Sequence, residues 1–248
     1  MKKYIILAAF VAAGVISISQ TQDVMTVKMK DGTVHEFKVE EVSEVVFQTT
    51  DEHGSPDVYL SCPDDNHPHL IDLGLPSGTK WACCNIGASS PEQYGGYYAW
   101  GETEEKNRYA WSTYIHCDGS SSTCHHIGDD IAGTEYDVAH VKWGGSWRMP
   151  SVDQIRELLD NCTRTWTQQN GVNGTLVTGP NGKTVFLPAA GYRWDDDLFG
   201  GGEGGHYWSS SLTPSYEYGA SSLRFDSYYW YWYYYYRFNG FSVRAVCP

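Results

Sequence analysis

The chain is poor in positive charge, and it has no apolar run long enough to cross a membrane as a helix. Its 248 residues carry 17 Lys and Arg against 30 Asp and Glu, a formal net charge of −13. Proteins that bind nucleic acid or anionic membranes need a basic surface, so we expect neither kind of partner. The mostly apolar stretch near the amino terminus covers residues 4–18, whereas a membrane-spanning helix needs about 20 residues. We therefore expect no membrane insertion of the mature chain.

The sequence also lacks the motifs of common enzyme classes. It contains no Gly-rich phosphate loop, no nucleophile elbow and no zinc-protease helix. Cys83 and Cys84 are adjacent, without the surrounding residues of the copper-binding cysteine pair in formylglycine-generating oxidases. We interpret His206 as a residue at a strand edge and not as a general base. The sequence therefore predicts no catalytic residue, no bound metal and no cofactor, and the protein is expected not to be an enzyme.

The amino-terminal residues have the pattern of an export signal. Lys2 and Lys3 precede the apolar stretch of residues 4–18, and the small residues Ser17 and Ser19 suit a signal peptidase. We predict a signal peptide over residues 1–22 and an exported chain that is periplasmic, on the outer surface or secreted. Removal of the two lysines takes the net charge from −13 to −15. An uncleaved membrane anchor is the alternative.

Seven cysteines in an exported chain are expected to pair, because the compartment is oxidising, and an odd number leaves at least one free thiol. Cys117 and Cys124 flank a Gly- and Ser-rich loop, and we predict a disulfide between them. The alternative is a zinc site that combines these cysteines with the neighbouring histidines His116, His125 and His126. Their spacing matches no strong zinc motif.

The amino-terminal part of the mature chain is predicted to form a small β-element over residues 23–49. Residues 24–29 and 34–39 alternate around an Asp31-Gly32 turn, and residues 45–47 form a third apolar segment. Residues 50–68 are rich in Asp, Pro, Ser and His and are predicted to be a linker. The main domain is expected over residues 69–248.

One helix is well indicated in this main domain. Ser151 is its expected N-cap, Gln154 completes a capping box, and an apolar face continues to about residue 161. Short strands are predicted at residues 175–178, 184–187, 207–211, 222–225 and 241–246. The fold class is α+β with an antiparallel sheet, because strands and helices do not alternate. The expected core residues are Trp147, Met149, Ile155, Leu158, Leu159, Phe186 and Phe241.

Six motifs of this domain resemble those of a known family. They are residues 73–82 (Leu-Gly-Leu-Pro-Ser-Gly-Thr-Lys-Trp-Ala), 88–102, 147–151 (Trp-Arg-Met-Pro-Ser), 186–193 (Phe-Leu-Pro-Ala-Ala-Gly-Tyr-Arg), 207–211 (Tyr-Trp-Ser-Ser-Ser) and 240–244 (Gly-Phe-Ser-Val-Arg). Together they resemble the Fibrobacter succinogenes major paralogous domain over about residues 70–248. That family is abundant in exported Bacteroidetes proteins. The resemblance implies a C-type-lectin-like fold and says less about function.

The most informative segment is residues 228–236, nine consecutive aromatics made of seven Tyr and two Trp. Side chains of an extended segment alternate between two faces, so about four of these rings must point away from the core. Four rings of roughly 150 to 250 Å² amount to about 600 to 1,000 Å², which reaches or exceeds the ~300 to 600 Å² of the largest apolar patch on a typical monomer. Tyrosine suits a wet interface better than a dry core, because its hydroxyl needs a partner.

We therefore predict a non-catalytic ligand-binding protein, adhesin-like or receptor-like, that presents this surface to an extracellular protein or glycan. The expected ligand-binding residues are Tyr228, Tyr229, Trp230, Tyr231, Trp232, Tyr233, Tyr234, Tyr235 and Tyr236, with Trp194, Tyr207 and Trp208 at the rim. An alternative interpretation is that the same rings have only a structural role and fill a loop-rich core. The alternative function is a subunit of a cell-surface assembly or fibre that self-associates through them.

Two further hypotheses concern the same half of the domain. In C-type-lectin-like proteins diversified by retroelements, the variable residues lie just ahead of the terminal strand, as residues 228–239 do here. Adenine mutagenesis of an Asn codon yields Tyr but never Trp, so Trp230 and Trp232 would need other template codons.

The acidic, Gly-rich loop at residues 195–205 offers carboxylates for calcium, but we favour a solvated loop because the Glu-Pro-Asn and Trp-Asn-Asp motifs of calcium-dependent lectins are missing.

Overall fold

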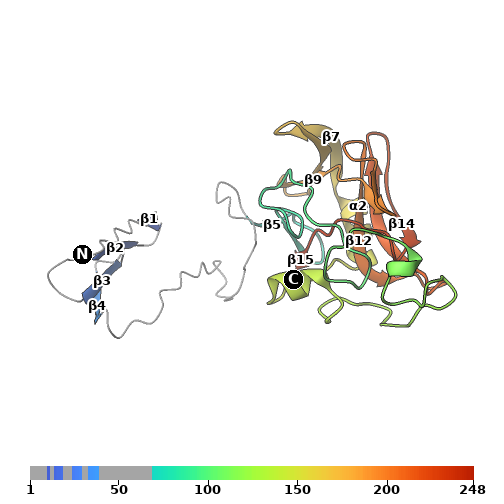
Figure 1. The fold of residues 1–248 in the computed structure, drawn as a ribbon. Coiled ribbons are helices and arrows are strands. Elements are labelled where there is room, and N and C mark those ends of the chain that lie inside the picture. Colours follow the sequence, from blue (N-terminus) through green and yellow to red (C-terminus); the bar gives the residue numbers. More distant parts are fainter. Residues whose placement is uncertain (1–9, 12–13, 19–23, 30–32, 39–68) are drawn as a thin grey trace. The chain divides into compact units, whose positions relative to one another are not determined.

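The computed structural model describes residues 10–11, 14–18, 24–29, 33–38 and 69–248 (Figure 1). The chain divides into two compact units, Met1–Thr49 and Thr50–Pro248. No helix in these described ranges has both the length and the apolar character needed to cross a bilayer.

The first unit is an antiparallel sheet of strands in sequence order. Its strands are β1 (Phe10–Val11), β2 (Gly14–Ile18), β3 (Val24–Met29) and β4 (Val34–Lys38). The last two are the strands expected at residues 24–29 and 34–39. The first two lie in the segment expected to be a signal peptide, whose removal stays a prediction. The predicted turn at 31–32, the strand at 45–47 and the linker at 50–68 lie outside the described residues.

The second unit is α+β, and all its named strand pairs are antiparallel, as predicted. Two three-stranded sheets and one hairpin make up most of it. The first sheet contains β7 (Thr163–Gln169), β8 (Val172–Thr178) and β9 (Thr184–Pro188), and the second contains β12 (Gly204–Leu212), β13 (Gly219–Asp226) and β14 (Trp230–Tyr236). The hairpin consists of β10 (Tyr192–Trp194) and β11 (Asp197–Phe199).

The two ends of the second unit meet in a third small sheet. Strands β5 (Leu70–Asp72) and β15 (Val246–Cys247) pair with the two edges of β6 (Lys80–Ala82). The strand predicted over residues 241–246 is wrong in extent, because regular pairing begins only at Val246. Before that point the backbone bonds loop residues instead, as where Phe241 exchanges hydrogen bonds with Tyr98.

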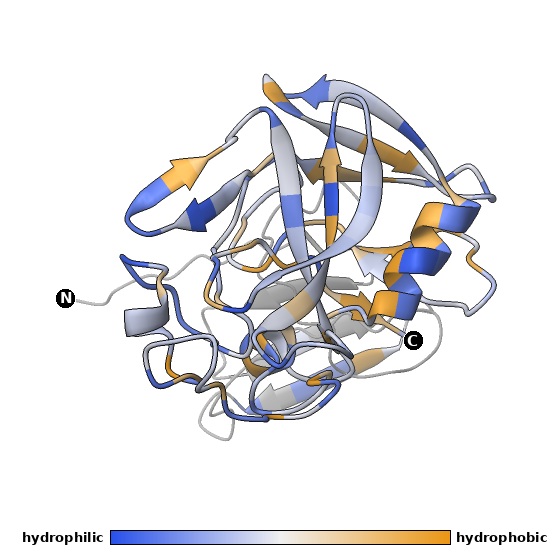
Figure 2. Ribbon diagram, turned by 90° about the vertical axis from the view of Figure 1, so that its right-hand side faces the viewer, coloured by the Kyte–Doolittle hydropathy of each residue, from blue (hydrophilic) through white to orange (hydrophobic). Residues whose placement is uncertain are grey.

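The helices are short. Within residues 69–248 they are η2 (Trp111–Thr113), α1 (Val138–Trp143) and α2 (Val152–Asn161). Helix α2 is the predicted one, and its capping box is present, with Ser151 Oγ accepting from the Gln154 N–H and the Gln154 side chain accepting from the Ser151 N–H. Apolar and charged residues share α2, as the mixed colours of Figure 2 show, and its apolar residues Ile155 and Leu158 are buried.

The core of the second unit is rich in tryptophan and includes most of the predicted residues. Trp81, Trp100, Trp147 and Trp208 are fully buried. Six of the seven expected core residues are also buried, while the seventh, Leu159, is half-buried against the same cluster. The expected burial is therefore confirmed at these six positions.

Arg244 joins three segments of this core. Its guanidinium is buried and donates to the carbonyls of Ala82, Cys83 and Phe186 and to the side-chain oxygen of Asn85. A buried charge is tolerated only when its donors are satisfied, and here backbone carbonyls take that role. The guanidinium thus fixes the carboxyl-terminal segment to the loop after β6 and to β9.

Candidate ligand-binding surface

Strand β14 carries the aromatic segment to the surface of the second unit. It pairs with β13 on one side only and forms the edge of the β12-β13-β14 sheet. Seven of the nine rings in residues 228–236 are between 36% and 81% exposed, and only Trp230 and Tyr235 are half-buried. Figure 2 views the sheet from the side of β14, which is pale there because Tyr and Trp have intermediate hydropathy.

A tight turn brings the first two tyrosines to the most exposed positions. One carboxylate oxygen of Asp226 accepts from the N–H groups of Tyr228 and Tyr229 at 2.7 and 2.8 Å, and the Asp226 N–H donates to the Tyr229 carbonyl. Burial alone would raise the pKa of Asp226, but these two N–H groups, with Arg224 and Arg164 nearby, hold it below its usual value. The ionised carboxylate therefore fixes the turn from which β14 starts.

Alternation along β14 divides its rings between two faces of the sheet. On the face that carries α2, Trp230 packs against the cluster containing Ile155 and Leu158, and the Arg156 guanidinium lies 4.3 Å from the centre of the Trp232 ring. This distance is typical of a cation–π contact. Helix α2 thus covers part of that face.

The opposite face carries a continuous row of contacting rings, which we call the tyrosine row; its two ends are exposed and its middle is buried. Successive ring centres along it are 6.4, 5.7, 5.2, 4.8 and 5.6 Å apart. Edge-to-face and stacked contacts at these distances stabilise each ring against its neighbours. The row runs from β14 across β12 to the β10-β11 hairpin through Tyr231, Tyr233, Tyr235, His206, Tyr192 and Phe199.

Burial keeps the imidazole of the row neutral. The His206 imidazole is buried, and its pKa falls to about 3, first because of burial and then because of Arg224. Arg224 donates to the Tyr235 hydroxyl at 3.2 Å and lies over the Tyr231 ring. Around neutral pH the row therefore combines a neutral imidazole with one guanidinium, and no carboxylate belongs to it.

A second group of rings, the end cluster, surrounds the far end of β14. Tyr236 lies 5.5 Å from Trp111 and 5.6 Å from Phe238, and Trp194 contacts Phe238 at 5.6 Å. The stacked pair Tyr233 and Tyr234 connects this cluster to the tyrosine row. The members of the end cluster are Trp111, Trp194, Tyr216, Tyr218, Tyr234, Tyr236 and Phe238.

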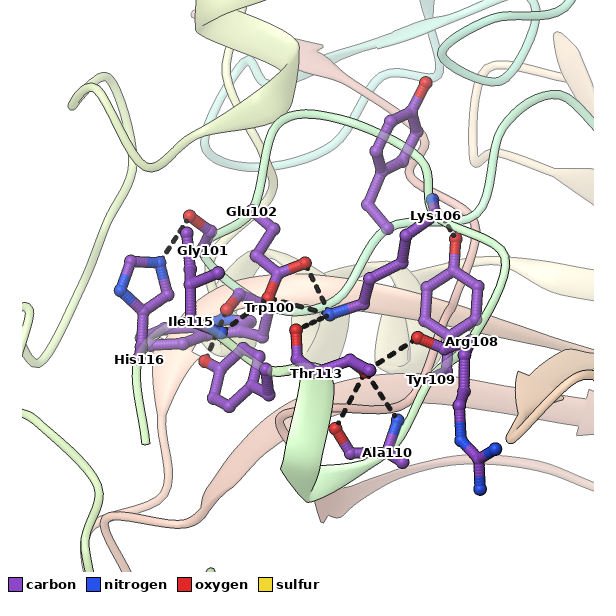
Figure 3. Close-up of polar contacts among 12 residues, drawn as sticks. Trp100, Gly101, Glu102, Lys106, Arg108, Tyr109, Ala110, Thr113, Ile115 and His116 are labelled. Atoms are coloured by element: carbon purple, nitrogen blue, oxygen red, sulfur yellow. Dashed lines mark hydrogen bonds and ion pairs between the residues drawn. The ribbon is translucent and has the colours of Figure 1, made fainter. Parts of the chain in front are cut away.

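A largely buried ion pair lies beside η2, the short helix that contains Trp111, and Figure 3 shows its polar contacts. The Lys106 ammonium lies 2.6 Å from a carboxylate oxygen of Glu102 and donates to the Thr113 carbonyl at the end of η2. The same carboxylate accepts from the Ile115 N–H. Desolvation lowers the pKa of Lys106, but the Glu102 carboxylate opposes that shift. The pair thus fixes the loop that carries η2.

A polar hollow of about 640 Å³ lies between this loop and the β10-β11 hairpin. Tyr97 and Tyr109 contribute rings to its lining, and the Arg193 guanidinium lies 5.5 Å from the Tyr97 ring centre. Glu105, Lys106, Asn107 and Asp196 supply the remaining polar groups. The end cluster and the hollow share the β10-β11 hairpin, since Trp194 belongs to one and Arg193 to the other.

Of the three residues predicted at the rim of the surface, one is exposed and two are buried. Trp194 is 43% exposed and belongs to the end cluster. Tyr207 and Trp208 are 2% and 0% exposed, so their assignment to the rim is wrong. They lie in the middle of β12, where both faces are covered, and their polar atoms donate to the carbonyls of Pro188 and Tyr98.

The predicted disulfide between Cys117 and Cys124 is present. It occupies both thiols of the alternative zinc site, while His125 contacts Asp118 and His116 contacts the Gly101 carbonyl. Cys83 and Cys84 are buried and are not paired with each other.

The acidic loop at residues 195–205 forms ion pairs with protein cations. Asp195 and Asp196 both pair with Arg108, the first at 2.8 Å. Over residues 69–248 and the described part of the first unit, no group of three or more His, Cys, Asp or Glu side chains is placed to hold a metal ion.

The sequence did not indicate several contributors to the surface. Trp111, Tyr192, Tyr216, Tyr218 and Phe238 lie outside residues 228–236. Tertiary contacts bring four of them to rings of β14 and bring Tyr192 to His206 of β12.

Comparisons of this chain with protein-family models, with curated proteins and with solved structures found no match.

Proposed function

We propose that the protein is an exported, non-catalytic binding protein that presents the tyrosine row and the neighbouring rings of β14 to an extracellular protein or glycan. The observation that carries this proposal is the exposure of seven rings in residues 228–236 on an edge strand. Rings held in place by their neighbours lose little side-chain entropy on binding, and Tyr adds a hydroxyl that forms hydrogen bonds. Binding surfaces of antibodies use the same chemistry.

We also propose a C-type-lectin-like fold for the second unit, in line with its six sequence motifs. Two features support this assignment. The unit is a loop-rich α+β domain with short antiparallel strands, and its two ends pair in one sheet. The predicted signal peptide completes the proposal, because it would take the domain to the compartment in which such a surface meets its ligand.

The test is a screen of the purified protein against glycan and extracellular-protein arrays, followed by variants of the hits. A double substitution, Tyr231→Ser with Tyr233→Ser, removes two exposed rings of the tyrosine row and leaves α2 and its contacts unchanged. We expect at least a tenfold weaker affinity, because each central aromatic of an interface contributes about 1 to 2 kcal/mol or more.

Ile115→Ser is the matched control, since Ile115 is 72% exposed and belongs to neither ring group. It is expected to bind like the wild type. Equal binding by the Tyr231/Tyr233 variant, or no hit for the wild type on either array, would refute the proposed function.

A further inference from the structure

The outer edge of β14 has backbone groups that no strand in residues 69–248 uses. Two hydrogen bonds at the ends of the β13-β14 pair show which residues of β14 bond to β13. They run from the Asp226 N–H to the Tyr229 carbonyl and from the Arg237 N–H to the Tyr218 carbonyl. Paired residues of an antiparallel ladder alternate between bonded and non-bonded positions. Trp230, Trp232 and Tyr234 therefore direct their N–H and C=O groups away from β13.

This edge lacks the features that prevent strands from pairing with other chains. Natural proteins protect an open edge with charged side chains, proline or a bulge. β14 has seven residues without charge or proline, and its register with β13 is continuous. The β12-β13 pair, by contrast, contains a register shift. An edge of this kind is expected to be paired in the working protein.

The lack of charge along the strand suits a second copy of the chain as the occupant. The protein carries a net charge of −13, yet residues 227–236 contain no charged side chain, so two copies meet there without opposing carboxylates. Two cations lie close to the strand: the Arg156 guanidinium over the Trp232 ring, paired with Asp153 at 2.8 Å, and the Arg224 guanidinium over the Tyr231 ring.

We propose that two copies pair β14 with β14 in antiparallel orientation, around a two-fold axis that passes through Trp232. Trp230 of each copy then lies opposite Tyr234 of the other, and the outward groups form about six backbone hydrogen bonds. The two sheets join as β12-β13-β14-β14-β13-β12. A two-fold contact pairs the open edge of each copy with that of the other and leaves neither edge open. If the occupant were a strand of another protein, the edge would stay open until that protein bound. This pairing does not depend on any ligand.

Joining the sheets places the two tyrosine rows side by side across the axis. Pairing uses the backbone edge, so the faces of Tyr231 and Tyr233 stay available in both copies. The dimer would thus present twice the aromatic area of one copy, on one side of a continuous sheet.

The test is the mass of the full chain in solution, measured by analytical ultracentrifugation over a range of concentrations. The wild type is expected to be a dimer at micromolar concentration. Trp232→Pro removes the ring and the outward N–H, whereas Trp232→Val removes the ring and keeps the N–H. Proline is tolerated on an edge strand where its nitrogen faces solvent. We expect the proline variant to be monomeric and the valine variant to remain a dimer, with at most a tenfold weaker association.

A cysteine scan checks the register without relying on the fold of the proline variant. Opposed residues next to the axis have Cα atoms about 5.5 Å apart, within reach of a disulfide. Trp232→Cys is expected to form a disulfide-linked dimer under mild oxidation, whereas Tyr228→Cys, at the more exposed turn, is expected to remain uncrosslinked.

A monomeric wild type, open-ended assemblies, or equal dimerisation of the Pro and Val variants would overturn the proposed pairing. The pairing would also be overturned if the wild type were monomeric and bound a protein ligand that the valine variant still binds and the proline variant does not. That result would assign the edge to a strand of another protein. A monomer that still binds ligand through Tyr231 and Tyr233 refutes only the pairing. A dimer that binds nothing refutes only the proposed function.

Discussion

Tyrosine has two different roles in this protein, and burial separates them. In the core, the hydroxyls of Tyr97, Tyr109, Tyr114 and Tyr207 each donate to a backbone carbonyl. A loop-rich core contains many carbonyls without a ladder partner, and a tyrosine hydroxyl satisfies one of them while its ring fills space. Burial raises the pKa of Tyr109 and of Tyr207 to about 12, so both remain donors at neutral pH. The preference of Tyr over Phe therefore does not by itself identify a surface.

His206 is the residue that should make the fold sensitive to acid. Its Nδ1 atom is buried without a partner, and its ring is packed against Tyr192, Tyr235 and Phe241. The pKa of the imidazole is about 3 in the fold and about 6.5 in an unfolded chain. Between these values only the unfolded chain takes up the proton. The contribution of the neutral imidazole to the free energy of unfolding is thus complete above about pH 6.5. It is lost as the pH falls, by at most about 1.4 kcal/mol per pH unit.

His206→Phe keeps the ring contacts and cannot be protonated. We expect its free energy of unfolding, measured with urea, to fall less than that of the wild type between pH 7 and pH 5. Parallel pH profiles for the two proteins would show that the imidazole is not kept neutral in the fold.

At the scale of elements, local chemistry defines α2 and the β7-β8 hairpin. Ser151 and Gln154 satisfy each other's backbone N–H groups at the start of α2. Between β7 and β8, Asn170 and Gly171 have φ angles of 49° and 82°. This is the left-handed conformation that a two-residue hairpin turn needs, and Asn-Gly is the dipeptide that adopts it most readily. The strand Thr163–Gln169 was not predicted, although this dipeptide marks where it ends.

Ser151→Ala tests the cap of α2. Loss of the hydroxyl leaves the Gln154 N–H without its partner, and we expect the protein to lose about 1 kcal/mol of stability. Ser121→Ala, in an exposed loop, is the control and should unfold like the wild type. An equal urea midpoint for the two variants would mean that the cap contributes nothing. The measurement is urea unfolding followed by tryptophan fluorescence.

At the scale of the whole molecule, the second unit closes on itself. Its first and last strands flank β6, and Arg244 fixes the final segment to two other parts of the core. The two units are separately compact. The second unit therefore has the core and the backbone pairing that independent folding requires.

We predict that a fragment of residues 50–248 folds alone. Its melting temperature by circular dichroism should lie within about 2 °C of that of the full chain, because a contribution of 1 kcal/mol shifts the melting temperature of a domain of this size by about 2 to 4 °C. A fragment that melts far lower would show that the first unit contributes to the stability of the second.

Features that depend on near neighbours in the chain could be predicted from residue patterns. The residue pattern predicted α2 from its cap and periodicity, the strands β3, β4, β8, β9, β12 and β13, the disulfide from its short loop and most of the expected core positions. Alternation also required that some rings of residues 228–236 leave the core. The residue pattern did not determine which side of a strand is covered, because the covered side depends on segments distant in the chain.

The details of the surface depend on tertiary contacts, which the structure shows. It buried Tyr207 and Trp208 in the middle of β12 and placed β14 at an edge. It also brought Trp111 and Phe238 to the rings of β14, and it connected Tyr192 to Tyr235 through His206. The physical reason is that burial and ring packing depend on the pairing order of strands and the path of loops, and local residue patterns do not encode either one.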